Sequence, residues 1–81
     1  MNRKIRLVWD FYGEPAQGTA DHHVVHLEQF MMRENLPFFN KGTQPTGPDH
    51  VMAFITVSEK DIPVLRDALK PNRAFVEKIE D

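Results

Sequence analysis

Apolar and polar residues alternate along the first part of the chain, from Ile5 to Tyr12. Successive side chains of a strand point to opposite faces, so this alternation gives one apolar face and one mixed face. The segment is also rich in the aromatic and β-branched residues that suit a pleated surface. The pattern predicts a β-strand whose apolar face carries Ile5, Leu7, Trp9 and Phe11.

A helical pattern follows from Thr19 to Asn35. Thr19 is a good N-cap residue, and Pro37 prevents the helix from continuing. The turn-rich stretch from Gly13 to Gly18 separates this helix from the first strand. The apolar residues recur at helical spacing and predict one buried stripe, made of Ala20, Val24, Leu27 and Met31 with Phe30 beside them.

Two further strands are expected around a segment rich in glycine and proline. Phe38–Lys41 is a short strand candidate, and Gly42–Pro48 is typical of a turn-rich connector. From His50 to Val57, apolar residues occupy both alternating faces. A strand with two apolar faces is normally buried on both sides, which predicts a central position for this one.

A second helix and a last strand complete the pattern. Asp61 is the expected N-cap, because Pro63 is tolerated only in the first turn of a helix. Pro71 ends the helix, and Ala74–Ile79 has the pattern of a strand. The packing stripe of this helix is formed by Ile62, Leu65, Ala68 and Leu69.

The resulting order of elements is β-α-β-β-α-β. It predicts a single α+β domain over residues 1–81, a ferredoxin-like plait with an antiparallel sheet and both helices on one face. A domain of 81 residues buries a modest fraction of its surface, and without cysteine it has no disulfide to stabilise it. Association of two copies would supply further burial, so we expect a homodimer or a higher symmetric assembly.

Charge and motifs exclude several classes of function. The formal net charge of −2 argues against a nucleic-acid partner, because such proteins usually carry a basic excess. No apolar run approaches the roughly 20 residues of a membrane span. The chain has no Gly-x-Gly-x-x-Gly motif, no phosphate-binding loop and no Gly-x-Ser-x-Gly motif. We therefore expect a cytoplasmic protein with no membrane partner and no cofactor.

Three of the four histidines lie within the first predicted helix. His22 and His26 are four residues apart and share a face, which is half of a familiar divalent-metal site. They also share that face with Gln29 and Arg33, as a solvated surface would. We favour the solvated surface and expect no metal ligand here. His23 lies at the edge of the apolar stripe, where a packed histidine is commoner than a catalytic one.

A second cluster lies on the less apolar face of the predicted sheet. Asp10 and Tyr12 are near the end of the first strand, and His50 and Met52 are near the start of the third. Antiparallel pairing would bring them together beside Phe54, giving a carboxylate, a phenol and an imidazole in one small-molecule site. The alternative is that Asp10 and Tyr12 are ordinary polar residues at the end of a strand.

The order of elements, the small size and the helix segment His26-Leu27 followed by Gln29-Phe30 resemble the YCII-related members of the dimeric α+β barrel superfamily. The resemblance implies two plaits that pack their sheets face to face, and an acid–base pair of a helix histidine with an aspartate. His23 or His26 would be that histidine. Leu69-Lys-Pro71 stands where the family has an Asp-Pro-Tyr-like segment.

Three functions follow as hypotheses. The leading one is a small-molecule-binding domain that uses Asp10, Tyr12, His50, Met52 and Phe54. The second is a small acid–base enzyme of the dimeric-barrel kind, in which a histidine works with Asp10 or Tyr12. The third is a structural or protein-interaction module, which requires no pocket. The first two differ in whether a histidine is held by a carboxylate and faces a cavity.

Overall fold

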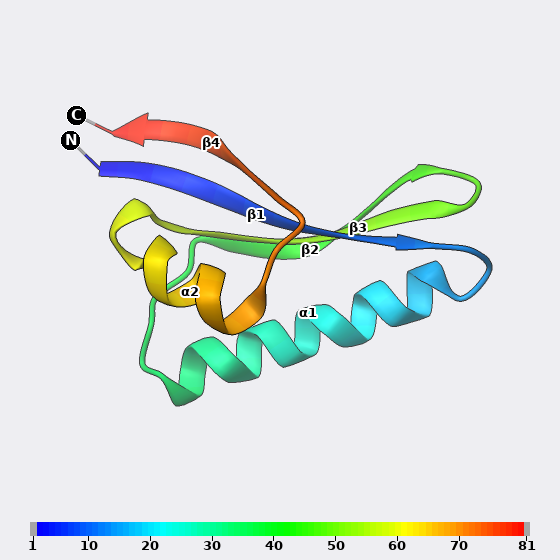
Figure 1. The fold of residues 1–81 in the computed structure, drawn as a ribbon, viewed down its shortest axis with the longest axis horizontal. Helices are drawn as coiled ribbons and strands as arrows, with labels where there is room; N and C mark the ends of the chain where they lie inside the picture. The colour runs from blue at the N-terminus through cyan, green and yellow to red at the C-terminus, as the bar shows by residue number, and fades with distance from the viewer. Residues whose placement is uncertain (1, 81) are drawn as a thin grey trace.

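The computed structural model describes residues 2–80 of the chain, and the side chains of residues 3–77. Met1 and Asp81, which we placed in the domain, lie outside the described residues. Figure 1 shows the elements in chain order: β1 (Asn2–Tyr12), α1 (Ala16–Arg33), β2 (Asn40–Gly47), β3 (His50–Ser58), a short 3₁₀ turn (Glu59–Asp61), α2 (Ile62–Leu69) and β4 (Arg73–Glu80).

The four strands form one antiparallel sheet in the order β2-β3-β1-β4. β3 pairs with β1 along its whole length, from Ser58 opposite Lys4 to His50 opposite Tyr12. Both helices lie on the same side of this sheet (Figure 1). The expected α+β architecture with an antiparallel sheet and two helices is confirmed.

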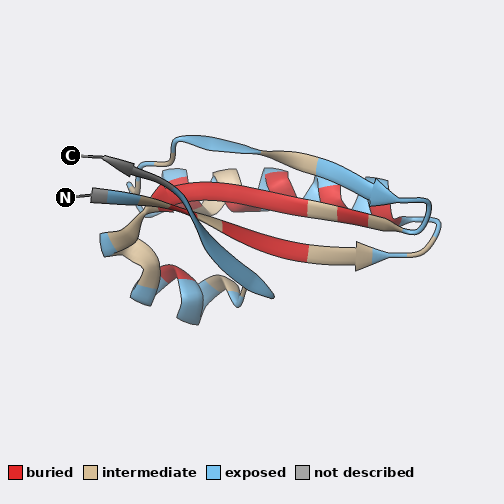
Figure 2. Ribbon diagram, turned by 90° about the horizontal axis from the view of Figure 1, so that it is seen from above, coloured by how far each residue is buried: buried red, intermediate tan, exposed pale blue. Residues whose placement is uncertain are grey.

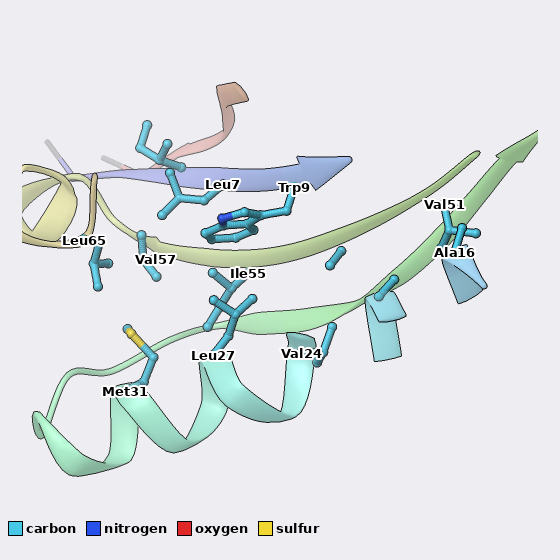
Figure 3. Close-up of a cluster of buried hydrophobic side chains, with 13 residues drawn as sticks. Leu7, Trp9, Ala16, Val24, Leu27, Met31, Val51, Ile55, Val57 and Leu65 are labelled. Carbon is cyan, nitrogen blue, oxygen red and sulfur yellow. The ribbon is translucent and has the colours of Figure 1, made fainter. Parts of the chain in front are cut away.

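The core lies between the sheet and the helices (Figure 3). The predicted apolar stripe of α1 is confirmed, since all four of its central residues are buried. Leu65 of α2 and Trp9 of β1 complete the cluster, and the Trp9 Nε1–H donates to the carbonyl oxygen of Leu69 at 2.9 Å. Trp9 is therefore a core residue that also ties the end of α2 to the sheet.

The face of the sheet away from the helices has no second layer within the described chain, yet several of its residues are buried (Figure 2). Val8, Phe54 and Thr56 are 0%, 9% and 1% exposed. The Arg6 guanidinium lies 4.1 Å from the centroid of the Phe54 ring, so its long side chain covers that ring. β3 lies between β2 and β1, so its expected central position is confirmed. On this side of it, the charged Arg6 side chain supplies cover.

The second strand differs from the prediction. β2 runs over Asn40–Gly47, and most of the expected connector is therefore strand. Each residue from Asn40 to Pro45 is opposite a residue of β3, and the register shifts between Pro45 and Gly47. A proline is tolerated there because β2 is an edge strand, and such a strand needs backbone donors on one side only. Pairing with β3 overrode the turn propensity of these residues.

The helix boundaries also shift. α1 begins at Ala16 rather than near Thr19, with Pro15 as the residue before the first turn. The Thr19 N–H donates to the carbonyl oxygen of Pro15, so Thr19 lies inside the helix and is not its N-cap. Asn35 has φ of 56° and ends the helix in the left-handed conformation, as expected. Asp61 precedes α2, also as expected.

The seating of α2 can be tested with two neighbouring residues. Leu65 is fully buried, whereas Val64 is 58% exposed. Leu65→Ala should lower the free energy of unfolding by about 2–4 kcal/mol, because it leaves a cavity beneath the helix. Val64→Ala, the matched control, should change it by less than about 0.5 kcal/mol. Urea unfolding of both variants measures the difference; equal losses would contradict this packing of α2.

Candidate functional site

The candidate site lies where β1, β3 and β4 meet on the face of the sheet away from the helices. The register places Asp10 opposite Met52 and Tyr12 opposite His50. Asn72, in the turn before β4, accepts a hydrogen bond on its Oδ1 from the Asp10 N–H at 2.9 Å. β1, its partner β3 and the turn that leads into β4 therefore fix the position of Asp10.

The Asp10 carboxylate accepts hydrogen bonds from two basic side chains. His50 Nε2 lies 2.7 Å from Oδ1, Arg73 Nη2 lies 2.6 Å from the same oxygen, and Arg73 Nε lies 3.2 Å from Oδ2. The arginine thus holds the carboxylate through two parallel bonds, a strong and directional arrangement. The Asp10 side chain is only 13% exposed. It is the centre of the cluster.

The pKa of Asp10 is set by two opposing effects. Burial acts to raise the pKa, because it disfavours the charged carboxylate. Hydrogen bonds from His50 and Arg73 to the carboxylate, together with their charges, outweigh burial and lower the pKa below its ordinary value. Asp10 is therefore an anion at neutral pH and is not available as a proton donor.

His50 is held on both ring nitrogens and on one ring face. Its Nδ1 is within hydrogen-bond distance of the Thr46 hydroxyl, which lies across the β2–β3 turn. Since Asp10 can only accept, His50 Nε2–H is the donor and Nδ1 accepts from Thr46 in the neutral imidazole. The Tyr12 ring stacks on the imidazole, with 4.6 Å between centroids and 9° between planes. The Tyr12 side of this stack is open, because Tyr12 is 69% exposed.

Four of the five residues proposed for ligand binding are joined by these contacts. Met52 joins the cluster through its sulfur, which lies 2.9 Å from Arg73 Nη2. Phe54 does not join it, because its ring lies beneath Arg6 and beside Gly42. The strand pairing that the sequence predicted is therefore what assembles Asp10, Tyr12, His50 and Met52.

Sequence reasoning missed three members of the cluster: Thr46, Asn72 and Arg73. Arg73 is the first residue of β4 and is opposite Val8 of the neighbouring strand β1, two residues before the Asp10 that it binds. Its length lets it reach Asp10, and pairing of the last strand with the first would have pointed to it. Thr46 was assigned to a connector, so its contact with His50 across the β2–β3 hairpin, next to the Gly47–His50 pair, was not expected.

The other two catalytic candidates, His23 and His26, lie on the opposite side of the sheet from Asp10. His23 packs against Trp9 and Phe11, at centroid distances of 4.9 and 5.5 Å. Those rings alternate with Asp10 along β1 and point toward the helices. Neither α1 histidine is placed to form an acid–base pair with Asp10; the histidine that meets this carboxylate is His50.

His23 is packed, as its position at the edge of the stripe predicted. Burial lowers the pKa of its imidazole, and the nearby charge of His26 lowers it further. His22 and His26 are exposed, as expected of a solvated face, and their Nε2 atoms are 2.9 Å apart. In residues 2–80 no three His, Cys, Asp or Glu side chains are grouped so that they could hold a metal ion.

A separate hollow lies away from Asp10. It is an open groove of about 230 Å³ that lies between the beginning of β1, the edge strand β4 and the start of α2. Its lining is mainly apolar and consists of Ile5, Glu59, Ile62, Ala74, Phe75 and Val76. None of the proposed ligand-binding residues lines it.

Comparison with known proteins adds no relative: no family model, no curated protein and no solved structure matches the chain. Within the described residues, neither helix has the length and apolar character needed to cross a membrane. The geometry of the site is thus the basis for its interpretation.

The depressed pKa of Asp10 predicts how stability depends on pH. The unfolded carboxyl titrates near pH 4, so its folded-state contacts contribute fully above that pH and are lost as pH falls through the lower folded pKa. Asp10→Asn should lower the free energy of unfolding at pH 7 by about 1–2 kcal/mol, given that Arg73 is half exposed. The deficit relative to wild type should shrink below pH 4.

Thermal unfolding at pH 7 and pH 3 measures this, with Asp67→Asn at the exposed face of α2 as the control. The control should follow the wild-type pH profile. A deficit in Asp10→Asn that is the same at both pH values would contradict the proposed ion pairs.

The histidines of α1 give a second prediction. Two exposed ligands do not complete the four-coordinate shell that zinc prefers, so Zn²⁺ should raise the melting temperature little or not at all. The double variant His22→Ala, His26→Ala should keep the metal-free stability within about 0.5 kcal/mol. His23→Ala should lose about 1 kcal/mol with or without metal, because it removes packing against Trp9. A rise of several degrees at stoichiometric Zn²⁺, absent in the double variant, would contradict the solvated-surface interpretation.

Proposed function

We propose that this chain is a small-molecule-binding domain of the ferredoxin-like plait type that works as a homodimer in the cytoplasm. The observation that carries the proposal is the continuous row of contacts from Tyr12 through His50 and Asp10 to Arg73. The order of elements along the chain supports the ferredoxin-like assignment. The resemblance to the YCII-related proteins is part of this proposal for the fold alone, without its face-to-face dimer or its acid–base pair of an α1 histidine.

The state of each group in the row favours binding. Asp10 is nearly buried, and both ring nitrogens of His50 have partners, so these two residues form the base of the site. The groups that face outward are the Tyr12 ring and the Arg73 side chain, which is 48% exposed. Groups fixed in this way lose little freedom when a ligand arrives, which favours affinity.

The exposed groups also define the class of ligand. The contacts of Arg73 with Asp10 and Met52 use three of the five N–H donors of a guanidinium. The others can bind a carboxylate, while the Tyr12 ring can stack on a planar group. The ligand that fits this pair of features is a small aromatic carboxylate.

A second candidate function is acid–base catalysis at His50. The favouring observation is the 2.7 Å contact that orients the imidazole on Asp10, as in enzymes that use a carboxylate to hold a general base. In that case Nδ1 would take the proton of the Thr46 hydroxyl or, after Thr46 moves aside, that of a substrate. Binding without turnover of the bound carboxylate would favour the first function over this one.

The test uses benzoate, with benzamide as a neutral probe of the same shape, followed by two-dimensional ¹H–¹⁵N NMR. Benzoate should bind with a dissociation constant of about 1–10 mM, as expected for so small a ligand, and should shift the amides of Tyr12, His50 and Arg73. Benzamide should bind more weakly, because it lacks the charge that Arg73 attracts.

Two variants and a control locate the binding. Arg73→Gln should weaken benzoate and leave benzamide unchanged, and Tyr12→Leu should weaken both. Arg66→Gln, at an exposed arginine of α2, should have no effect. The proposal is wrong if the shifts gather at the groove by Ile62 or are unchanged in Arg73→Gln.

A further inference from the structure

The two edges of the sheet differ in how they are protected. The edge strand β2 has the sequence NKGTQPTG, in which a proline and two glycines disfavour pairing with another chain. The opposite edge, β4, has the sequence RAFVEKIE, which contains neither residue; its register with β1 shifts at Glu77, after the apolar centre. In the described chain β4 has a neighbour on one side only, β1. Its other side offers backbone donors and acceptors for one more strand.

The middle of β4 is apolar and exposed on both faces. Ala74, Phe75 and Val76 are all exposed, with Phe75 and Val76 at 46% and 44%. Ala74 and Val76 also line the apolar groove beside Ile62, which no other part of the described chain fills. Three consecutive exposed residues of this kind in an edge strand are typical of an interface and not of a solvated edge.

The charges of β4 fit a second copy of the same strand. Let two β4 strands pair antiparallel about a twofold axis at Phe75. In this register the residue numbers of each facing pair add up to 150. Phe75 therefore faces Phe75 of the other copy, Ala74 faces Val76, and Arg73 faces Glu77. Arg73 and Glu77 already pair with Asp10 and Arg6 within one protomer, and in this register they also bring opposite charges together at both ends of the apolar centre. No like charges meet among these five positions.

We propose that β4 pairs with β4 of a second copy in this register and joins two four-stranded sheets into one. The inference rests on the homodimer of the proposed function and names its interface. Val76 of each protomer then lies beside Ala74 of the other on the helix side, where it covers the groove next to Ile62. On the other face the two Phe75 rings meet, and the Asp10–His50 site stays open in both protomers.

Pairing at the edge also suits the open face better than face-to-face packing does. The open face carries Arg6 over Phe54 and Arg73 across to Asp10 and Met52. Burying that face against its own copy would remove the Arg6–Glu77 and Arg73–Asp10 ion pairs from water, and the desolvation of such pairs can cost more than their attraction returns. Edge pairing leaves these side chains solvated.

The register makes a sharp test possible, because Phe75 faces itself. Phe75→Glu and Phe75→Lys each place two like charges across the axis, and each should raise the dimer dissociation constant about tenfold or more. Mixed in equal amounts, the two variants should form a heterodimer, since a Glu then faces a Lys. Phe39→Glu, at another half-exposed aromatic near the opposite edge, should dimerise like the wild type.

Sedimentation velocity at micromolar concentration measures each sample. Wild type that stays monomeric overturns both the homodimer and this interface; Phe75→Glu that stays dimeric overturns the interface alone. A mixture that stays monomeric overturns the register. A measurement on wild type alone guards against misfolded variants: hydrogen exchange of the β4 amides should become faster when the protein is diluted below the dimer dissociation constant. Exchange that is independent of concentration contradicts the proposal. The benzoate experiment tests the ligand site separately.

Discussion

The position of β1 between β3 and β4 is the constraint on which the rest of the molecule depends. Because side chains alternate along a strand, β1 sends Trp9 toward the helices and Asp10 to the opposite face. Trp9 then anchors the end of α2 through Leu69, while Asp10 draws in His50 from β3 and Arg73 from β4. β1 thereby positions both the core and the candidate site, through its adjacent residues Trp9 and Asp10.

The face of the sheet away from the helices shows how a small domain can cover apolar residues without a second layer. Arg6 shields Phe54, and Arg73 extends past its register partner Val8 to Asp10 and Met52. The aliphatic parts of these side chains bury the residues below while the guanidinium groups stay at the surface. The apolar side chains of Met52 and Phe54 on this face are therefore largely covered. The exposed apolar residues of β4 are at the edge of the sheet.

Site and groove occupy different ends of β1 and suit different partners. Asp10 lies near the end of the strand among charged and hydrogen-bonding groups, which favour a small polar ligand. Ile5 lies near its beginning, in an apolar groove beside the exposed apolar centre of the β4 edge, which favours a protein partner. A dimer formed at the β4 edge would leave the Asp10 site accessible. The proposed ligand site and the proposed interface thus lie in separate regions of this fold.

The sequence by itself determined the order of elements, the apolar face of β1 and the stripe of α1, because burial imposes a period of two on a strand and of 3.6 on a helix. It also placed Asp10, Tyr12, His50 and Met52 in one region, through antiparallel pairing of two well-patterned strands. Tertiary structure decided the rest. Pairing with β3 made a strand of Gly42–Gly47 against its turn propensity, and the reach of Arg73 across β1 completed the site; neither depends on local pattern, because both are set by neighbours distant in the chain.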